Sequence, residues 1–463
     1  MARLCLFTGS FNPPGLHHRA AAMELAKTFE AVQVIPCGYR PDKPNHDAIP
    51  TVLRAALTDL GFSRLDRVTV DHFDLERDVA TTNVDLDRRF SSQGELWHAV
   101  WADKLEGGRK GQSEVQTQWH DGPRAWQTLR FAVLKTPDMA LDRADLPPRH
   151  QVVIVPRSGS SREIRFVLFS GQSAQEQLDP RVREFIHRYS LYTLGPPRTK
   201  ASLDLAGKKL KIVADTWNAA ALERQNRLRA IRDDDNPDAV LVLGGDGTML
   251  RAIRENWALR VPFIGLNYGH LGFLMNESAE LFGTDDRLVE KLLVRRLPML
   301  HVTITKRDGS KVEELCFNDA WVERSTGQTA WLTLSLNGEV RLEKVVCDGI
   351  LVSTAAGSTA YALSMGAPPL LADTPAWLVV GSNVMRPLGW KTAMLPMDAE
   401  VKVVNAAPDR RLLNGFVFNN KYEDVLAMEA RVSRVASVEL AFSEKHDMAR
   451  KISDLQFGTV KAL

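Results

Sequence analysis

The sequence has almost no net charge and no long hydrophobic run. Its 463 residues include 59 Lys and Arg against 57 Asp and Glu, a formal net charge of +2. Such a balance gives no argument for a nucleic-acid or membrane partner. No run approaches the roughly eighteen apolar residues of a membrane-spanning helix. The apolar stretch at the N-terminus is short and contains Arg3, so a signal peptide is not predicted either.

Cysteine is scarce. The four cysteines are Cys5, Cys37, Cys316 and Cys347, and no two of them form a C-x-x-C pair. This spacing predicts neither a zinc site nor a redox motif. We expect buried free thiols in a reducing compartment, and therefore a cytoplasmic protein.

The chain is long enough for two to four domains. Apolar residues make up 44% of it and charged residues 25%, as in folded globular proteins. Residues 196–203 combine proline, glycine and polar residues, which is typical of a linker. We therefore predict one domain over residues 1–195 and a second over residues 204–463.

Both domains have the pattern of an α/β fold. In the second domain, strands and helices alternate over residues 204–297, which predicts a small α/β lobe with ligands at the carboxyl ends of its strands. Short segments of alternating hydrophobicity follow over residues 298–440 and predict a mostly β lobe. The tail, residues 441–463, contains a helical pattern at 445–457, and we expect it to return to the first lobe.

The most informative stretch is residues 241–250. An apolar run at 239–243 predicts a buried strand, and residues 249–257 predict a helix. Between them, Gly244, Gly245, Gly247 and Thr248 form the strand–turn–helix setting that presents N–H groups to phosphate. Glycine is expected here for close approach of a phosphate and for positive φ angles. Asp246 is awkward for an anion site, so it is a candidate proton acceptor or metal contact; the alternative is an ordinary turn with Asp246 as a helix N-cap.

Three further groups of polar residues follow. Asn318 and Asp319, an amide beside a carboxylate, suit an adenine or ribose edge, although a simple turn is the alternative. Residues 348–364 place small hydroxyl side chains around Gly357, which leaves room for a flat ligand. Arg386 is a candidate positioning cation.

Together these motifs resemble the NAD kinases. The resemblance runs through residues 244–248, 265–274, 318–319, 348–349 and 357–361, in the family's order and spacing. The Gly-Gly-Asp-Gly turn also occurs in lipid kinases and phosphofructokinases, and the Gly-Ser-Thr-Ala-Tyr run at 357–361 is what points to NAD kinase. The sequence departs from the family at Asp319, at Ala355 and Ala356, and at Asn414.

The resemblance implies a reaction and a set of site residues. Asp246 would take the proton of the adenosine ribose 2′-hydroxyl of NAD, and that oxygen would attack the γ-phosphoryl group of ATP, held with Mg²⁺. A homo-oligomer is implied as well. The residues implied for ATP are Gly244, Gly245, Gly247 and Thr248. Those implied for NAD are Asp246, Gly247, Asn318, Asp319, Asp348, Thr359, Ala360, Tyr361 and Ser364.

The first domain opens with a βαβ pattern. Strands are predicted at residues 4–7 and 32–35, and a helix at 20–29. His17 and His18 stand at the predicted start of this helix, where free N–H groups favour a phosphate and histidine can donate to a transferring phosphoryl group. The alternative is two exposed histidines near a helix cap.

This domain resembles the nicotinamide or nicotinate mononucleotide adenylyltransferases, a nucleotidyltransferase family with a Rossmann-like fold. The resemblance rests on residues 9–13 with His18, on Lys43, on Thr81, Thr82 and Asn83, on Asp103, on residues 160–165 and on the helix at 180–192. It implies His18 as the catalytic residue. It implies binding of ATP phosphates by Gly9, Ser10, Phe11, Lys43, Ser160, Ser161 and Arg165.

The first domain also departs from its family. Gly15 stands where His or Thr opens the signature, His17 stands for Gly or Met, Trp101 for Gly and Arg162 for Thr. His17 could replace the lost side chain in space. Two hypotheses remain open: a bifunctional enzyme using ATP, NAD and a mononucleotide, or an NAD kinase with an inactive nucleotide-binding or regulatory first domain. A lipid kinase is a distant third.

Overall fold

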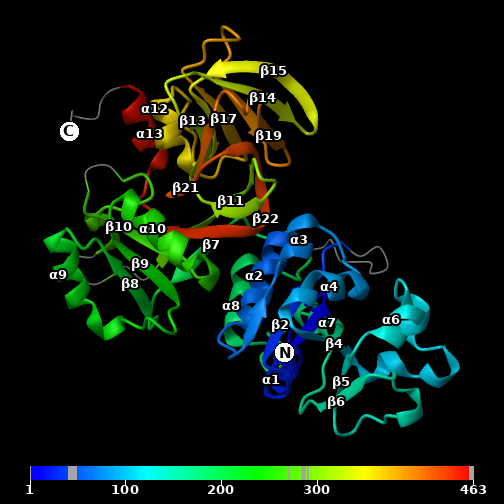
Figure 1. The fold of residues 1–463 in the computed structure, drawn as a ribbon. Helices are drawn as coiled ribbons and strands as arrows, with labels where there is room; N and C mark the ends of the chain where they lie inside the picture. The colour runs from blue at the N-terminus through cyan, green and yellow to red at the C-terminus, as the bar shows by residue number, and fades with distance from the viewer. Residues whose placement is uncertain (1, 40–48, 270–271, 283–287, 289–290, 458–463) are drawn as a thin grey trace. The chain divides into compact units, whose positions relative to one another are not determined.

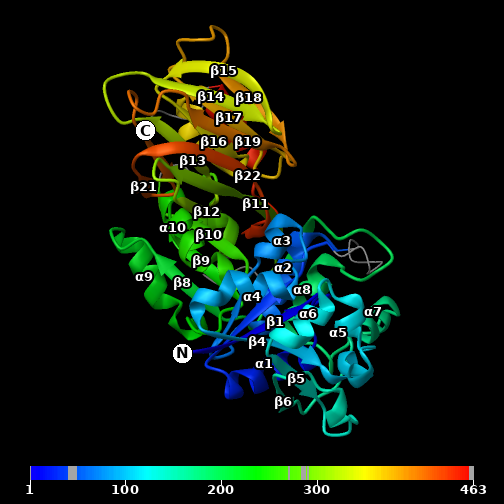
Figure 2. The ribbon, with the colours of Figure 1, turned by 45° about the vertical axis from the view of Figure 1, so that its right-hand side comes forward.

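The computed structural model describes residues 2–39, 49–269, 272–282, 288 and 291–457. They form two compact units, Met1–Arg198 and Thr199–Leu463. Figures 1 and 2 show the ribbon in two orientations. In the part of the chain that is described, no helix has both the length and the apolar character needed to cross a membrane.

The first unit is built on a parallel sheet of six strands. The strand order is β3-β2-β1-β4-β5-β6, and every neighbouring pair is parallel. The order reverses between β1 (Arg3–Gly9) and β4 (Glu95–Trp101). In doubly wound sheets ligands bind at the carboxyl ends of the strands at such a reversal. The remaining strands are β2 (Ala31–Pro36), β3 (Val68–Val70), β5 (Phe131–Lys135) and β6 (His150–Ile154).

Four helices of the first unit matter for its candidate site. α1 (Leu16–Thr28) follows β1, and α2 (Thr51–Phe62) precedes β3. Near the end of the unit, α7 (Ser161–Phe169) begins with the side chain of Ser160 accepting from the N–H of Arg162. It is followed by α8 (Pro180–Tyr189), which begins with Asp179 as its cap.

The second unit begins with a strand where a linker was expected. β7 (Lys200–Asp204) pairs antiparallel with β11 (Lys291–Lys306), so residues 200–203 of the predicted linker belong to a sheet. The reason is the alternation of this segment: Ala201 and Leu203 are buried, while Lys200, Ser202 and Asp204 are exposed. Proline and glycine just before it, at residues 195–197, gave the linker signal.

A parallel core carries the next strands. β8 (Leu210–Ala214), β9 (Ala239–Gly244) and β10 (Phe263–Asn267) pair in parallel, and β10 pairs in parallel with the end of β22 (Val425–Phe442). Between them lie α9 (Ala219–Arg227) and α10 (Asp246–Asn256). At the end of the described chain, α13 (Met448–Gln456) packs Met448 and Ile452 into the same buried cluster as Val240 and Met249.

The predicted boundary between the two lobes lies at residue 298, within β11. β11 continues through it, and its long antiparallel partner β22 likewise runs through both lobes and past residue 440. The register shifts between Pro298 and Leu300, which is the local irregularity that a proline causes in a strand. The same two strands therefore belong to both lobes.

The rest of this unit is antiparallel. β19 (Glu400–Asn405), β14 (Ala330–Leu336) and β15 (Glu339–Cys347) extend the mixed sheet from β22, and β12 (Lys311–Cys316) pairs with β11. A separate sheet has the order β18-β17-β16-β13-β20-β21. Its strands are β13 (Asp319–Arg324), β16 (Gly349–Thr354), β17 (Ala376–Ser382), β18 (Thr392–Pro396), β20 (Leu413–Val417) and β21 (Asn420–Tyr422).

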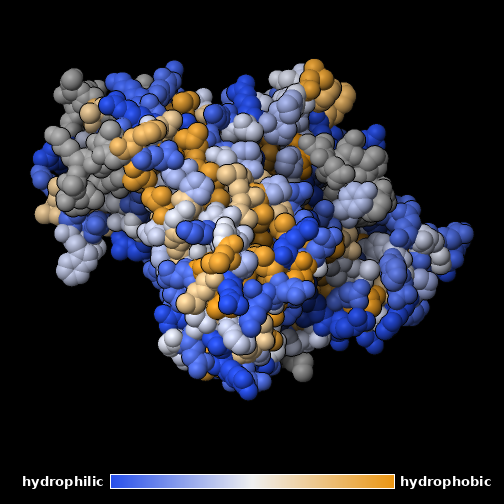
Figure 3. Space-filling view, turned by 90° about the horizontal axis from the view of Figure 1, so that it is seen from above, coloured by the Kyte–Doolittle hydropathy of each residue, from blue (hydrophilic) through white to orange (hydrophobic). Residues whose placement is uncertain are grey.

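Large apolar side chains are not confined to the interior. Met385, Leu388 and Met394 are all exposed. The face drawn in Figure 3 shows apolar residues interspersed with hydrophilic ones.

Candidate functional site

The Gly-rich turn lies between β9 and α10. A Cβ on Gly244 would come within 2.5 Å of Thr248 Oγ1, so only glycine fits there. A Cβ on Gly245 or Gly247 would meet nothing within 4 Å, which leaves open space beside the first turn of the helix. None of the three has a positive φ, so the expectation of left-handed glycines is wrong: close packing at Gly244 is what requires glycine here.

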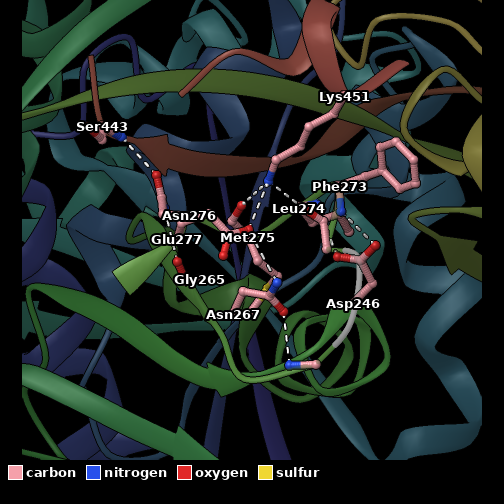
Figure 4. A network of polar contacts seen from close by, with 12 residues as sticks. Asp246, Gly265, Asn267, Phe273, Leu274, Met275, Asn276, Glu277, Ser443 and Lys451 are labelled. Atoms are coloured by element: carbon pink, nitrogen blue, oxygen red, sulfur yellow. Dashed lines mark hydrogen bonds and ion pairs between the residues drawn. The ribbon is translucent and has the colours of Figure 1, made fainter. Parts of the chain in front are cut away.

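Asp246 is the first residue of α10 and not its cap. Gly245 occupies the cap position, with an extended backbone and no capping side chain, so the N-cap interpretation of Asp246 is wrong. The carboxylate instead accepts from two consecutive N–H groups, Phe273 at 2.9 Å and Leu274 at 3.0 Å. It therefore joins the Gly-rich turn to the segment after β10 (Figure 4).

The electrostatics of Asp246 are balanced between opposing effects. Burial raises the pKa of its carboxyl above the ordinary value. The N–H groups of Leu274 and Phe273 and the charge of Lys451 lower the pKa and offset part of that rise. Such a carboxylate is a stronger base than an exposed aspartate and still has lone pairs to accept a proton.

Asn318 has a free acceptor. Its side-chain Oδ1 is buried and has no hydrogen-bond partner among the residues that the structure describes. Its main-chain carbonyl accepts from the N–H of Thr354 at 2.8 Å. A Cβ on Gly357 would lie 2.5 Å from that carbonyl, so Gly357 lets the 356–359 turn pack directly on Asn318. A buried oxygen without a partner is costly, which marks the place where a ligand donor would fit.

Asp319 begins β13 beside this turn. It pairs in register with Ser353 of β16. Burial raises the pKa of its carboxyl to about 6. Phe317, just before it, belongs to the same buried cluster as Phe273 and Leu274, so the Asn318 turn and the segment held by Asp246 border one core.

Asp348 is held by two neighbours. Arg324 Nε donates to Oδ1 at 2.6 Å, and Asn383 Nδ2 donates to Oδ2 at 2.8 Å. Both carboxylate oxygens of Asp348 therefore accept a hydrogen bond, which fixes the carboxylate in position. Arg386, the candidate cation, is exposed and follows this region in the sequence.

The remaining predicted NAD residues lie in one short turn. Thr359 ends a 3-10 segment, and Tyr361 begins α12 (Tyr361–Ser364). Ala360, Tyr361 and Ser364 are exposed. The Tyr361 ring meets Trp321 edge-on at 5.2 Å, and Trp321 stacks on Phe416 at 4.8 Å. Burial and the charges of Glu323, Asp319 and Asp348 raise the pKa of Tyr361.

The first unit has its own cluster at the carboxyl end of β1. His18 Nδ1 accepts from the N–H of Gly15 at 3.1 Å, and the rings of His17 and His18 lie 3.9 Å apart. Burial and the neighbouring His17 hold the pKa of His18 well below its usual value. Because Nδ1 accepts, the neutral ring carries its proton on Nε2 and can donate there.

His17 fills the space beside Gly15. A Cβ on Gly15 would lie 2.6 Å from Nδ1 of His17 and 2.6 Å from Cδ1 of Ile164. Burial and Arg157 lower the pKa of His17 to about 4. The side chain that Gly15 lacks would therefore collide with the His17 ring.

The predicted phosphate residues of the first unit converge on residues 9–13. Ser161 Oγ donates to the carbonyl of Pro13 at 2.8 Å, and Arg165 Nη1 donates to that of Asn12 at 2.5 Å. Arg165 also lines an open, mostly apolar cavity of about 370 Å³. Gly9 lies against the Phe11 ring, Ser10 offers its carbonyl to Arg54, and Ser160 caps α7. Lys43 lies outside the described residues.

The other residues on which the adenylyltransferase resemblance rests form hydrogen bonds or ion pairs with side chains or main chain close to them. Thr81 donates to Asp74 through Oγ1 at 2.6 Å, and Thr82 caps α4 (Asn83–Phe90). Asn83 Oδ1 lies 3.2 Å from Nδ1 of the buried His98. Asp103 is exposed and forms an ion pair with Lys104 at 3.8 Å.

Sequence reasoning missed residues that support Asp246. Lys451, Glu277 and Asn267 hold the segment that Asp246 contacts, and Arg324 holds Asp348. Asn267 lay inside a quoted motif, but Lys451 had no sequence signal beyond its place in a predicted helix.

Two family models match this chain, and the first match begins inside the first unit. Residues 164–291 match the family described as the ATP-NAD kinase N-terminal domain, and residues 317–410 match the ATP-NAD kinase C-terminal domain. An NAD kinase of Brucella suis is 33% identical over 227 residues, which is 48% of this chain and 86% of that protein. One of Caulobacter vibrioides is 32% identical over 244 residues, 51% of this chain and 92% of that protein.

A solved structure is similar at lower identity. The yeast NADH kinase complexed with NADH is 18% identical, covers 55% of this chain and 89% of that chain, and has a TM-score of 0.45. Because the Brucella and Caulobacter proteins are matched over most of their length at more than 30% identity, this chain belongs to the NAD kinase family.

Proposed function

We propose that the second unit phosphorylates NAD on the adenosine ribose 2′-hydroxyl, with ATP as the phosphoryl donor. The observation that carries the proposal is Asp246: a half-buried carboxylate at the start of α10, beside open space at Gly245 and Gly247. A helix N-terminus attracts phosphate, while the carboxylate is suited to accept a proton.

In the proposed reaction, Asp246 takes the proton of the 2′-hydroxyl as its oxygen bonds to the γ-phosphorus of ATP. The bond from that phosphorus to the bridging oxygen breaks, and ADP leaves. Positioning and charge stabilisation carry most of the rate in such transfers. The N–H groups at the start of α10, with Thr248 in its first turn, would hold the phosphates.

NAD would lie along the Asn318 turn and the 359–364 segment. The unpartnered Oδ1 of Asn318 suits a donor such as the adenine amino group or a ribose hydroxyl. Asp348, fixed by Arg324 and Asn383, would face the nicotinamide half. Asp319, Thr359, Ala360, Tyr361 and Ser364 complete the proposed contacts.

Mg²⁺ would enter with ATP. Among the described residues, no three His, Cys, Asp or Glu side chains are grouped as a metal site requires. Phosphate oxygens are preferred Mg²⁺ ligands, and the Gly-rich turn itself contains one carboxylate, that of Asp246. We therefore assign the ion to the substrate, where it would neutralise charge on the transferred group.

For the first unit we propose mononucleotide adenylyltransferase activity. The favouring observation is His18, a neutral imidazole whose protonated Nε2 is a donor at the start of α1, beside the switch point of a doubly wound sheet. His17 stands in the space beside Gly15 and could supply the donor that Gly15 lacks. The alternative is a nucleotide-binding or regulatory unit without activity.

One pair of reactions tests both proposals. The purified chain is incubated with Mg²⁺ and ATP, either with NAD or with nicotinamide or nicotinate mononucleotide, and the products are separated. NADP from NAD supports the kinase, and a dinucleotide from a mononucleotide supports the adenylyltransferase. No NADP from folded protein would overturn the kinase proposal; no dinucleotide would leave the first unit as a binding module.

A further inference from the structure

The segment of residues 272–277, which follows β10, lies between two opposite charges. Asp246 accepts from its N–H groups on one side, and Lys451 donates to its carbonyl groups on the other (Figure 4). Lys451 is in α13, more than 170 residues further along the chain. A single strip of backbone is therefore fixed by an anion and a cation at once.

Lys451 makes three contacts with the segment. Nζ donates to the carbonyl oxygens of Gly272 at 2.8 Å and Met275 at 3.0 Å, and it lies 3.4 Å from Oε1 of Glu277. An ammonium group has three N–H donors, so all three have an acceptor here. The side chain is 15% exposed, which makes these contacts stronger than those of a surface lysine.

The helix that carries Lys451 is itself anchored. Met448 and Ile452 are buried on either side of it in the core of the parallel strands. The side chain of Asp447 accepts from the N–H of Arg450 and caps the helix. Lys451 thus reaches the segment from a rigid support.

The segment is tied to the sheet at its other end. Asn276 Nδ2 donates to the carbonyls of Gly265 and Ala441, and its Oδ1 accepts from the N–H of Ser443. Asn267 Nδ2 donates to Glu277 Oε1 at 3.2 Å. Among the residues described, the side chains that hydrogen-bond to the main chain of residues 272–275 are Asp246 and Lys451.

We propose that Lys451 is a positioning residue for the phosphoryl transfer: by fixing residues 272–275 it fixes the N–H groups that orient Asp246. This inference rests on the proposed kinase function. The positive charge of Lys451 and the N–H groups that it holds in place both lower the pKa of Asp246, because a nearby cation and hydrogen-bond donors favour the ionised carboxylate. Among the described residues, the charged groups in these contacts are Lys451 from α13, Glu277 from the segment and Asp246 from α10.

The test compares Lys451→Met with Arg450→Met. Arg450 is the adjacent residue, is exposed and pairs only loosely with Asp454 at 3.8 Å. Lys451→Met should lower kcat at least tenfold and move the acid limb of the pH profile to higher pH, because the pKa of Asp246 rises without the cation. Arg450→Met should leave both unchanged.

Amide hydrogen exchange gives a readout that does not depend on the reaction. In Lys451→Met, peptides containing residues 272–277 should exchange faster than in the parent chain, and in Arg450→Met they should not. If Lys451→Met is not recovered folded, Lys451→Arg carries the test. Its charge is retained, but a planar guanidinium on a shorter aliphatic stem does not match the same three acceptors, so exchange should rise while the acid limb stays in place.

Two results would overturn the inference: unchanged exchange at residues 272–277 in a folded Lys451→Met, or a loss of thermal stability in that variant with kcat and the acid limb unchanged. A parent chain that makes no NADP would instead overturn the kinase proposal, and hydrogen exchange would still decide whether Lys451 orders the segment.

Discussion

The main-chain N–H of Gly15 donates to Nδ1 of His18 over 3.1 Å. That bond decides which ring nitrogen of His18 can act on a ligand, because a neutral imidazole that accepts at Nδ1 must carry its proton on Nε2. The same bond joins Gly15, which departs from the adenylyltransferase signature, to His18, which matches it.

We expect His18→Ala to remove dinucleotide formation from a mononucleotide and ATP, by about a hundredfold or more, because one donor to developing charge is worth roughly 3 kcal/mol. NADP formation by the second unit should be unchanged. Product separation by chromatography measures both. His120→Ala, at an exposed histidine of the same unit, is the matched control and should leave both activities intact. Equal dinucleotide formation by His18→Ala and the parent would exclude His18 from catalysis.

We expect Asp246→Ala to abolish NADP formation, because the substitution removes the carboxylate proposed to take the proton of the 2′-hydroxyl. Asp235→Ala, at an exposed carboxylate of the same unit, should retain full activity. NAD affinity of Asp246→Ala, measured by calorimetry, should change little if the fold is retained. Substantial turnover by a folded Asp246→Ala protein would refute the assignment.

Substitutions at Gly244 and Gly247 should distinguish an effect on packing from an effect on ligand binding. Gly244→Ala places a methyl group 2.5 Å from Thr248 Oγ1, so we expect a lower melting temperature, from a loss of about 1 to 3 kcal/mol. Gly247→Ala meets nothing within 4 Å and lies in a helix, where alanine is favoured over glycine by up to about 1 kcal/mol.

Gly247→Ala should therefore keep or raise the melting temperature while raising KM for ATP, because the methyl group occupies the space proposed for phosphate. Thermal melts and initial rates at varied ATP decide the matter. If Gly247→Ala has the parent's KM for ATP, the phosphates are not held at this turn.

Much of this site followed from local sequence. The run at residues 239–243, the glycines and the periodicity after Asp246 all specify one strand–turn–helix, and β9 and α10 lie there. The proposed contact of Asn318 with an adenine or ribose edge was drawn from its residue type and stays a prediction. The sequence could not reveal why Gly244 must be glycine, since that depends on the Thr248 side chain in the folded turn.

Features that depend on contacts between residues far apart in the sequence could not be predicted from it. β22 has 18 residues and lies mostly within the predicted β lobe, but a strand of that length was not predicted, because its stability comes from pairing with β11, β19 and β10. Lys451 is the same case for a side chain: its acceptors lie more than 170 residues away, and nothing in a helical pattern marks one lysine as buried.

Asp319 gives a prediction on stability and pH. Its carboxyl has a pKa of about 6 in the folded chain, raised by burial from an ordinary value of 3.8. Between those values the folded state binds more protons than the unfolded state, so stability falls as pH rises through this window and stays lower above it. Asp319→Asn removes that titration. At pH 7.5 it should raise the melting temperature, from a gain on the order of 1 to 3 kcal/mol.

At pH 4 or below the two proteins should melt at nearly the same temperature, because Asp319 is then protonated in the folded chain and costs little to bury. Melts of the parent and of Asp319→Asn across pH 4 to 8 measure the difference directly. A parallel pair of curves would mean that Asp319 is ionised at no cost in its site. A gap that opens as pH rises from about 4 to about 6 and then stays constant identifies the Asp319 carboxyl itself, since Asn is close in size but does not ionise.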